Sequence, residues 1–570
     1  MRFKILRIII IALFILIIVN LFYAQVIRGR YFYDLSTNNR IRAVPLKGWR
    51  GRIQDRNHII LADNRLSYNL MLTPQDTHDL DQVFHFLSDV LSVSEKRIAQ
   101  IYGRRASAPF VPIVIAEDIS RQQAIAVEEN RYRFPSLLVE QNFKRFYPLN
   151  NNSAHVLGYV GKINRSKLEK LKEYGYSAAS MIGYLGVEEY YDRYLKGATG
   201  GLQVEVNSRG QQVRLLGFKE PAKGQDIRLT IDARIQQMAL EILQENNGAI
   251  VVMDMKNGEI LGMTSSPSYN PNIFLDHSSG TDIPELLNNV SSPMLNRVIR
   301  GTFSPGSVFK VIMAVAALDQ HKVNLKQTFL CQGVYEVGGT KFGCTHSHGA
   351  QNLMDALTHS CNIYFYHVGS FLGETMIHQY AEMFGLGKLT NIDLPYEGTG
   401  FVPNRLKKTQ SGGSWYTGDT LNFSIGQGDL LVTPLQLVRM MATVAQDGLE
   451  VQPHVVKSID DKDVDLYSSV RLLGVDRNIF QSVQKGLRYA VTDFSGTAHS
   501  LNMDGLYVAG KTGTVQTSTT KANHAWFVGY TKGTQTEIAF CVFLEHGGSS
   551  ANACLLARQL LLRMQEQKIL

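Results

Sequence analysis

The chain has 570 residues, of which 44% are hydrophobic and 19% are charged, and its formal net charge is +8. This length predicts two or three folded units rather than a single core. The charge is modest for the length and forms no basic stripe interleaved with aromatic residues, which argues against a nucleic-acid partner. It is compatible with binding to an anionic membrane or to cell-wall material.

The N-terminus predicts a membrane anchor. It is basic at Arg2, Lys4 and Arg7. An apolar stretch of 17 residues follows at 8–24, and its apolar neighbours lengthen it enough to span a bilayer. A cleaved signal peptide is the alternative, but a cut after Ala24 would put Phe22 where the cleavage site takes a small residue. We therefore expect an uncleaved anchor at 8–27, with 1–7 in the cytoplasm and nearly all of the remaining chain across the membrane.

The stretch after the anchor predicts a folded region of short strands and helices. The elements expected are helices at 83–93 and 120–131 and a hairpin at 202–216 that turns at Ser208, Arg209 and Gly210. A polar, glycine-bearing stretch at 217–226 is typical of a domain boundary.

The chain beyond this boundary predicts an α+β domain. Asp232 fits the N-cap of an amphipathic helix at 233–247, and Asn257 followed by Gly258 is a strong hairpin turn. The other expected elements are two strands within 248–266, a largely helical middle, strands at 505–515, 524–531 and 537–546, and a last helix at 550–567 with an apolar face through Cys554, Ala557, Leu561 and Met564. This order favours one antiparallel sheet flanked by helices.

Three short motifs point to chemistry. They are Ser307-Val-Phe-Lys310, Ser360-Cys-Asn362 and Lys511-Thr-Gly-Thr514. Each alone has an ordinary structural explanation, namely a helix cap, a polar loop and a strand edge with a solvated lysine. A further S-x-x-K at 518–521 precedes no helical pattern, and we interpret it as a solvated loop. Together, the helix start, loop and strand follow in the order that S-x-x-K acyl-transfer enzymes require.

The first motif can form a nucleophile and its base. At a helix start, Ser307 and Lys310 share one face and point into the same cleft. The serine hydroxyl needs a base to take its proton, and a lysine is a base near pH 7 only when it is neutral. Burial and a second cation, for which Lys511 is the candidate, both lower the pKa of Lys310.

With these motifs, the chain resembles the class B penicillin-binding proteins, which are monofunctional peptidoglycan transpeptidases. The resemblance covers essentially the whole chain and also rests on "RGRIQDRNHIILADN" at 50–64, "GYLGVEEYYDRYLKGATG" at 183–200 and "FSIGQGDLLVTPLQL" at 423–437. The short anchor, the length and a cysteine–histidine cluster are similar to the elongation-specific branch, penicillin-binding protein 2, with the division-specific branch as the alternative. The resemblance implies an elongated mixed α/β pedestal of the dimerisation type at 28–222, and a transpeptidase domain at 223–570 with a five-stranded antiparallel sheet and an all-helical subdomain.

The resemblance implies roles for the first two motifs. Ser307 attacks the penultimate D-Ala carbonyl of a stem peptide ending in D-Ala-D-Ala, and its N–H and that of Thr514 form the oxyanion hole. Ser360 relays a proton between a motif lysine and the leaving amine. Asn362 orients Lys310 and holds a substrate amide.

The third motif is expected to bind the substrate. Lys511, Thr512 and Thr514 present a cation and two hydroxyls, which suit a terminal carboxylate. Gly513 allows close approach of the substrate backbone.

The resemblance implies a serine D,D-transpeptidase that cross-links peptidoglycan for cell elongation and rod shape, and that beta-lactams acylate at Ser307. It implies a single-pass protein of the inner membrane with a periplasmic catalytic domain, and a SEDS-type glycosyltransferase and the elongation machinery as partners. One alternative is a hydrolytic D,D-carboxypeptidase or beta-lactamase, against which the large N-terminal module argues. Another is a membrane-anchored scaffold with an inactive catalytic domain, against which three intact motifs argue.

The cysteines indicate a metal site. Cys541 and Cys554 lie in apolar patterns and are expected in the core. The remaining three combine with a histidine in the set Cys331, Cys344, His348 and Cys361, which can form a tetrahedral zinc site. The alternative is a disulfide between the first two cysteines with the third buried, and His346 is the other available imidazole. The resemblance favours a structural zinc beside the second motif, although the family often has aspartates at the first two positions.

Overall fold

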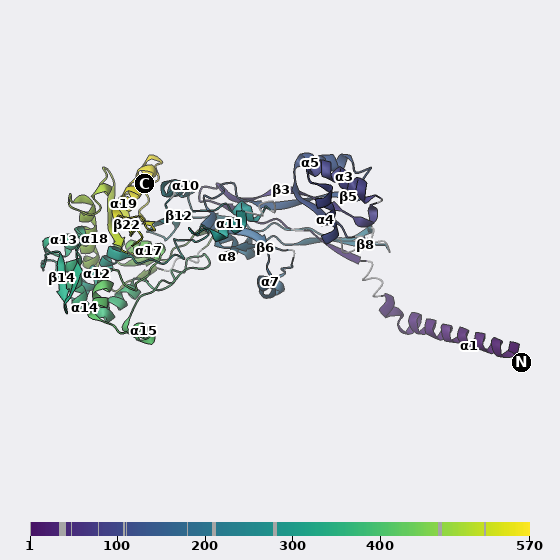
Figure 1. Ribbon diagram of the computed structural model, residues 1–570, viewed down its shortest axis with the longest axis horizontal. Coiled ribbons are helices and arrows are strands. Elements are labelled where there is room, and N and C mark those ends of the chain that lie inside the picture. Colours follow the sequence, from purple (N-terminus) through teal and green to yellow (C-terminus); the bar gives the residue numbers. More distant parts are fainter. Residues whose placement is uncertain are drawn as a thin grey trace. The chain divides into compact units, whose positions relative to one another are not determined.

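A computed structural model of the protein describes residues 2–33, 41–46, 48–77, 79–105, 109, 111–178, 180–207, 212–244, 246–276, 282–464, 470–517 and 520–570 (Figure 1). The chain forms two compact units, and both are assembled from separated segments. The first comprises 1–51, 64–145 and 196–224, and the second comprises 52–63, 146–195 and 225–570. The predicted division into domains at residue 222 stays a prediction.

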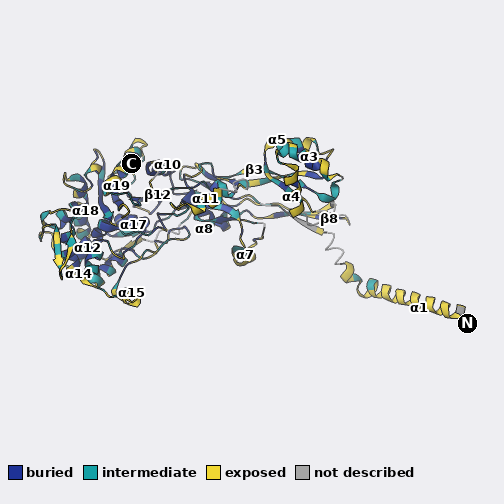
Figure 2. Ribbon diagram, in the orientation of Figure 1, coloured by how far each residue is buried: buried dark blue, intermediate teal, exposed yellow. Residues whose placement is uncertain are grey.

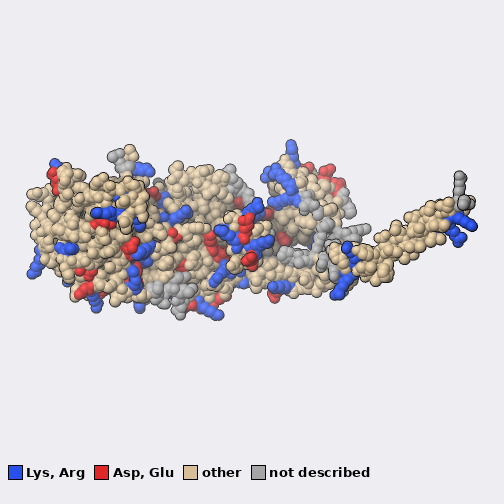
Figure 3. Space-filling view, turned by 90° about the horizontal axis from the view of Figure 1, so that it is seen from below, with Lys and Arg blue, Asp and Glu red and all other residues tan. Residues whose placement is uncertain are grey.

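The N-terminal apolar stretch is a helix. α1 (Arg2–Phe22) continues as a π-helical turn at Tyr23–Ile27. The segment from Phe3 to Ile27 is long and apolar enough to cross a membrane, and its described side chains are almost all exposed (Figure 2). Figure 3 shows an uncharged stretch of this helical segment between basic side chains near its two ends. The predicted apolar helix is thus confirmed, and its orientation stays a prediction.

The first unit contains two β-structures. One is an antiparallel sheet of β1 (Ile41–Leu46), β8 (Gly200–Val206) and β9 (Gln212–Lys219), in which β8 and β9 pair as the predicted hairpin. The turn residues Ser208 to Gly210 lie outside the described residues. In the other, β3 (Ile60–Leu72) pairs with β4 (Ile113–Ile119) and with β5 (Leu137–Phe146).

Three helices pack on the second of these β-structures. They are α3 (Leu80–Leu91), α4 (Glu95–Arg105) and α5 (Arg121–Glu129), and they share one apolar core with β3 and β4. The two predicted helices, α3 and α5, are confirmed. Each begins behind a side chain that caps it, because Asp79 accepts from the N–H groups of α3 and Ser120 forms a capping box with Gln123 in α5.

The second unit carries several short elements around its main domain. A small sheet contains β19 (Lys462–Asp463), β18 (Val456–Ile459), β10 (Ile227–Leu229), β2 (Ile53–Gln54) and the start of β3. The other short elements are α6 (Ala154–Leu157), β6 (Tyr159–Lys162), α7 (Arg165–Leu171), β7 (Met181–Tyr184), α8 (Gly186–Tyr190), α9 (Asp192–Leu195), α11 (Asp282–Asn288), β17 (Leu449–Val451) and β20 (Val470–Leu472).

The main domain is built on a five-stranded antiparallel sheet, as predicted. Its order is β12 (Ile260–Ser266), β11 (Gly248–Asp254), β23 (Ile538–Leu544), β22 (His524–Lys532) and β21 (Tyr507–Val515). The N- and C-terminal parts of the domain therefore meet within one sheet, and β21 is its edge strand. The Asn257–Gly258 hairpin joins β11 to β12 as expected.

Helices cover both faces of this sheet (Figure 1). α10 (Ala233–Leu243) and α19 (Ser550–Glu566) form one core with its first face. Asp232 caps α10 as predicted, but the helix ends four residues earlier than expected. The other face packs on a helical region of α12 (Lys310–Asp319), α13 (Leu353–Thr358), α14 (Asn362–Met383), α15 (Arg405–Gln410), α16 (Thr417–Ser424), α17 (Pro434–Ala445) and α18 (Arg477–Thr492).

Two small hairpin-like pairs precede the second motif. They are β13 (Phe329–Cys331) with β16 (Gly349–Gln351), and β14 (Val334–Val337) with β15 (Thr340–Gly343). They place the cysteine–histidine segment next to the start of α14. The α+β class with one antiparallel sheet flanked by helices is confirmed.

Candidate active site

Ser307 lies in a tight turn and not in the first turn of an α-helix. The turn is η5 (Gly306–Phe309), a 3-10 helix that runs directly into α12. Gly306 has φ 54°, and a Cβ at this position would lie 2.7 Å from Val515 Cγ2. A Cβ on Gly513 would similarly lie 2.9 Å from Pro305 O. These two glycines therefore let the serine turn pack directly against β21.

Lys310 is buried beneath this turn and reaches the second motif. Its Nζ donates to Ser360 O at 2.8 Å and to Asn362 Oδ1 at 2.6 Å, and it lies 3.5 Å from Ser360 Oγ. Its exposed fraction is 0%. Burial lowers the pKa of Lys310 to about 8, while the cysteines Cys344 and Cys361 raise it in part. The residue is therefore far closer to a neutral amine at physiological pH than an exposed lysine.

The second motif connects α13 to α14. Ser360 has φ 57°, which is unusual for a residue with a side chain and indicates that its neighbours hold it. Asn362 is the first residue of α14, and its Nδ2 donates to Gly343 O at 3.1 Å. Its backbone N–H donates to Cys344 Sγ at 3.2 Å. The amide of Asn362 is thus fixed on one side by Gly343 and presents its oxygen to Lys310.

The third motif lies on the edge strand β21. Lys511 is fully buried, and its Nζ donates to Thr512 O at 3.3 Å. Burial first, and the charge of Lys310 second, hold the pKa of Lys511 well below its usual value. Thr512 Oγ1 donates to Thr497 Oγ1 at 2.9 Å. Thr514 is half-buried beside Gly306.

The structure brings the three predicted motifs together. Lys310 joins the first motif to the second by hydrogen bonds, and the serine turn packs on the strand of the third. Among the described residues, no hydrogen bond joins Lys511 or Thr512 directly to Ser360. Ser518 and Thr519 of the further S-x-x-K lie outside the described residues. Gly343 and Thr497 were not among the predicted residues, because a carbonyl contact and a loop threonine carry no periodic or motif signal.

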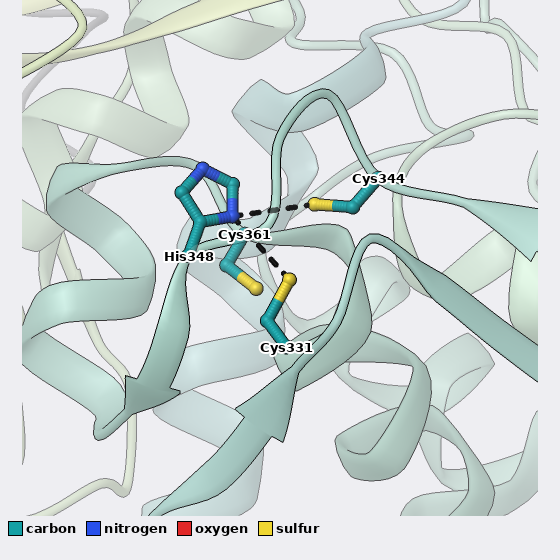
Figure 4. Close-up of side chains that lie close together, drawn as sticks. All are labelled: Cys331, Cys344, His348 and Cys361. Carbon is teal, nitrogen blue, oxygen red and sulfur yellow. Dashed lines mark hydrogen bonds between the residues drawn. The ribbon is translucent and has the colours of Figure 1, made fainter.

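The four predicted cysteine and histidine ligands form one cluster beside the second motif (Figure 4). Their ligand atoms all lie within 4.8 Å of one another. His348 Nδ1 lies 3.5 Å from both Cys331 Sγ and Cys344 Sγ. His346, the other imidazole considered, contributes its carbonyl, which accepts from the Cys331 thiol at 3.4 Å. A thiol hydrogen bond from Cys361 lowers the pKa of Cys344.

The predicted core cysteines are confirmed, since Cys541 and Cys554 are both buried, one on each face of the sheet. All five cysteines are free thiols in the structure.

Comparison with known proteins places this fold and motif arrangement in a family. The model of the penicillin-binding protein transpeptidase domain matches residues 248–561, and that of the penicillin-binding protein dimerisation domain matches residues 45–229. The chain is 33% identical to the Peptidoglycan D,D-transpeptidase MrdA of Escherichia coli strain K12, over 96% of this chain and 91% of that protein. It is 32% identical to the protein of the same name from Haemophilus influenzae, over 95% of this chain and 88% of that protein.

Solved structures agree with these relatives. A complex between Penicillin-Binding Protein (PBP2) and MreC from Helicobacter pylori has a TM-score of 0.84 at 27% identity, covering 93% of this chain and 99% of that chain. A structure described as a peptidoglycan synthase complex that coordinates polymerization and crosslinking has a TM-score of 0.76 at 28% identity, covering 98% and 97%. The chain therefore belongs to the class B penicillin-binding protein transpeptidases, and the two relatives named above are peptidoglycan D,D-transpeptidases.

Proposed function

We propose that the chain cross-links peptidoglycan stem peptides during cell elongation, with Ser307 as the nucleophile and Lys310 as its base. The observation that carries this proposal is the buried Lys310 amine, held between Ser360 and Asn362 one turn after a half-exposed serine. The Ser307 hydroxyl has no hydrogen-bond partner within the described part of the chain, which leaves it available to a substrate.

The reaction proceeds in two acyl transfers. Ser307 Oγ attacks the penultimate D-Ala carbonyl while Lys310 takes its proton, and the N–H groups of Ser307 and Thr514 receive the developing oxyanion. The terminal D-Ala leaves as an amine with a proton relayed through Ser360. The side-chain amine of a neighbouring stem then attacks the ester, and the serine regains its proton.

The third motif binds the end of the donor peptide. The Thr512 and Thr514 hydroxyls accommodate the carboxylate, and the amine of Lys511 is held at a buried position on the same strand. Gly513 has a role in packing the serine turn as well as in giving the substrate room along the strand.

The reaction products distinguish this function from hydrolysis. We expect purified protein, given a donor stem ending in D-Ala-D-Ala and an acceptor stem with a free side-chain amine, to form the cross-linked dimer, as seen by mass spectrometry of the mixture. Release of D-Ala with only the shortened donor would identify a carboxypeptidase. Absence of both products and of penicillin labelling would identify an inactive scaffold.

We propose that the cysteine–histidine cluster holds a structural zinc ion. Zinc–sulfur bonds of about 2.3 Å and zinc–nitrogen bonds of about 2.1 Å put a sulfur and a nitrogen ligand of a tetrahedral site about 3.6 Å apart, close to the observed sulfur–nitrogen separations of 3.5 Å. Three thiolates and an imidazole are also the donor set that zinc prefers. The ion would fix Cys344 and Cys361, and through them the Asn362 N–H and the start of α14, so its chemistry is structural.

Zinc content and acylation rate should fall together. We expect about one zinc per chain after purification without chelator, and Cys344→Ser should lower both the zinc content and the rate of penicillin acylation. Cys554→Ala, which removes a thiol outside the cluster, should retain the metal. A zinc-free and fully active enzyme with a Cys331–Cys344 disulfide in its peptide map would contradict this assignment.

We propose that α1 anchors the chain in the cytoplasmic membrane with its basic end inside and residues 28–570 in the periplasm. In this arrangement 28–222 form the pedestal and 223–570 the transpeptidase domain. A SEDS-type glycosyltransferase and the elongation machinery are the partners, a proposal supported by the relatives solved with MreC and in a synthase complex.

Membrane topology can be measured directly. A reporter fused after residue 40 should be active outside the cytoplasm, because short basic N-terminal tails stay inside. The mature N-terminus should remain at Met1 or Arg2. A mature chain that begins near residue 25 would instead identify the apolar helix as a cleaved signal.

A further inference from the structure

We propose that His359 and Ser495 are positioning residues that hold the second and third motifs in register. Ser495 belongs to a bracket, defined here as the loop 493–497 between α18 and β21, and His359 contacts this bracket from the end of α13. This inference rests on the proposed function, since it assigns the bracket a role in serine acylation.

His359 is the residue immediately before Ser360 and makes contacts on both sides of its ring. Its Nδ1 lies 2.8 Å from Gln351 Oε1, and its Nε2 lies 2.9 Å from Ser495 Oγ. The amide of Gln351 is oriented by its own bonds, because Nε2 donates to the carbonyls of His348 and Ala350 at 3.0 and 3.1 Å. The His359 ring is therefore fixed at one nitrogen by a buried glutamine and meets the bracket with the other.

The bracket is organised to receive this contact. Ser495 Oγ and its backbone N–H both donate to Asp493 Oδ1, at 2.6 and 2.8 Å. Gly496 allows the tight return of the loop, since a Cβ there would lie 2.4 Å from Ala490 O. Ser495 is thus held in place by its own loop, and its hydroxyl contacts His359, the residue before the second motif.

The same loop contacts the third motif two residues later. Thr497 Oγ1 accepts from Thr512 Oγ1 at 2.9 Å. The Thr497 N–H and hydroxyl both donate to Thr358 O, at 3.3 and 3.4 Å. The bracket therefore touches α13 and the second motif through Thr358 and His359, and β21 through Thr512.

This bridge matters because the described residues provide no direct hydrogen bond between the second and third motifs. Ser360 also has a left-handed φ of 57°, so its position depends on what holds its neighbours. Acyl transfer is sensitive to displacements of about 1 Å among reacting groups. A loose second motif would displace Ser360 and the Asn362 oxygen that orients Lys310, which slows acylation while leaving the nucleophile intact.

If His359 only capped α13, replacing Ser495 would not affect acylation. If His359 joins the motifs, replacing either residue should slow it. His359 follows the last residue of α13, so its replacement changes both the cap and the bridge. Ser495 lies outside that helix and outside the cysteine–histidine cluster. A similar loss of acylation rate on replacing His359 and on replacing Ser495 would therefore come from the contact between them and not from the cap of α13.

The test measures benzylpenicillin acylation of the full-length protein as a saturation series, which separates the acylation rate constant from the apparent binding constant. We expect His359→Ala and Ser495→Ala each to lower the rate constant about tenfold, the size of effect that one lost hydrogen bond produces. The double variant should be no slower than His359→Ala alone, because that substitution has already removed the contact that Ser495→Ala removes.

Conservative variants give a second readout. His359→Gln places an amide nitrogen near the position of Nε2 and can still reach Ser495, whereas His359→Asn can reach only Gln351. The glutamine variant should therefore be faster than the asparagine variant. His378→Ala removes another histidine, which lies in the C-terminal half of α14 and contacts Pro403 and Asn404 rather than the bracket, and it should acylate like the wild type.

Zinc content and thermal midpoint of each variant are measured alongside. A wild-type rate constant in Ser495→Ala, or additive losses in the double variant, would overturn the inference, whatever the metal content of the His359 variants. These results differ from failure of the proposed function itself, which would appear as wild-type protein that is not labelled, or is labelled at a residue other than Ser307.

Discussion

Ser307→Ala protein should not be labelled by a fluorescent penicillin, although it should be folded. The nucleophile is lost completely, and removing a catalytic serine typically lowers the rate by many orders of magnitude, about 10⁶-fold in a serine protease. The substitution should cost at most about 1 kcal/mol of stability, because the hydroxyl caps no helix and makes no hydrogen bond among the described residues. Gel fluorescence and a thermal melt provide the two measurements.

The serine of the other S-x-x-K supplies the control. Ser518→Ala should be labelled like the wild type, since no helical pattern follows this serine in the sequence. Full labelling of Ser307→Ala, or loss of labelling in Ser518→Ala, would show that the nucleophile has been assigned to the wrong motif.

Lys310→Arg should also lose most of its acylation activity. Arginine stays protonated at any accessible pH and cannot take the serine proton. Loss of a general base costs about 10²- to 10⁴-fold in rate. Because a larger charged group in a fully buried site can also disturb the fold, Lys310→Met serves as the matched variant, since it removes the base and leaves an uncharged side chain of similar length. Both variants should show the loss of rate in stopped-flow acylation, and an active Lys310→Met would contradict the assignment of the base.

The pH profile of the wild type reports the same residue. The amine must be neutral to act, and its pKa is lowered to about 8, so the acylation rate should rise with pH and level off above about pH 8. A profile that is flat across this range would assign the proton acceptor to another group.

The regular parts of the catalytic domain could be predicted from sequence because their side chains follow the geometry of the elements. Short, mostly apolar runs predicted the strands that became β21, β22 and β23, and the Asn257–Gly258 turn predicted the β11–β12 hairpin. The last helix was confirmed with its apolar face buried. The spacing of Cys331, Cys344, His348 and Cys361 predicted a cluster that the structure brings together.

The remaining features depend on close contacts that leave no such pattern. The 3-10 turn at Ser307 exists because Gly306 and Gly513 permit backbone packing, which sequence periodicity does not reveal. The contacts of Thr497 with Thr512 and of the Gly343 carbonyl with Asn362 join segments that are 15 and 19 residues apart through loops. The two compact units also interleave in sequence, with 52–63 and 146–195 belonging to the second, because pairing of short strands can recruit distant segments.

The central claim is that Ser307 forms the acyl-enzyme. The most direct test is mass spectrometry of the intact benzylpenicillin adduct followed by peptide mapping. The predicted result is one adduct per chain, located on Ser307 in the peptide that contains the GTFSPGSVFK segment. An adduct mapped to Ser360, Ser518 or any residue outside the first motif would contradict it.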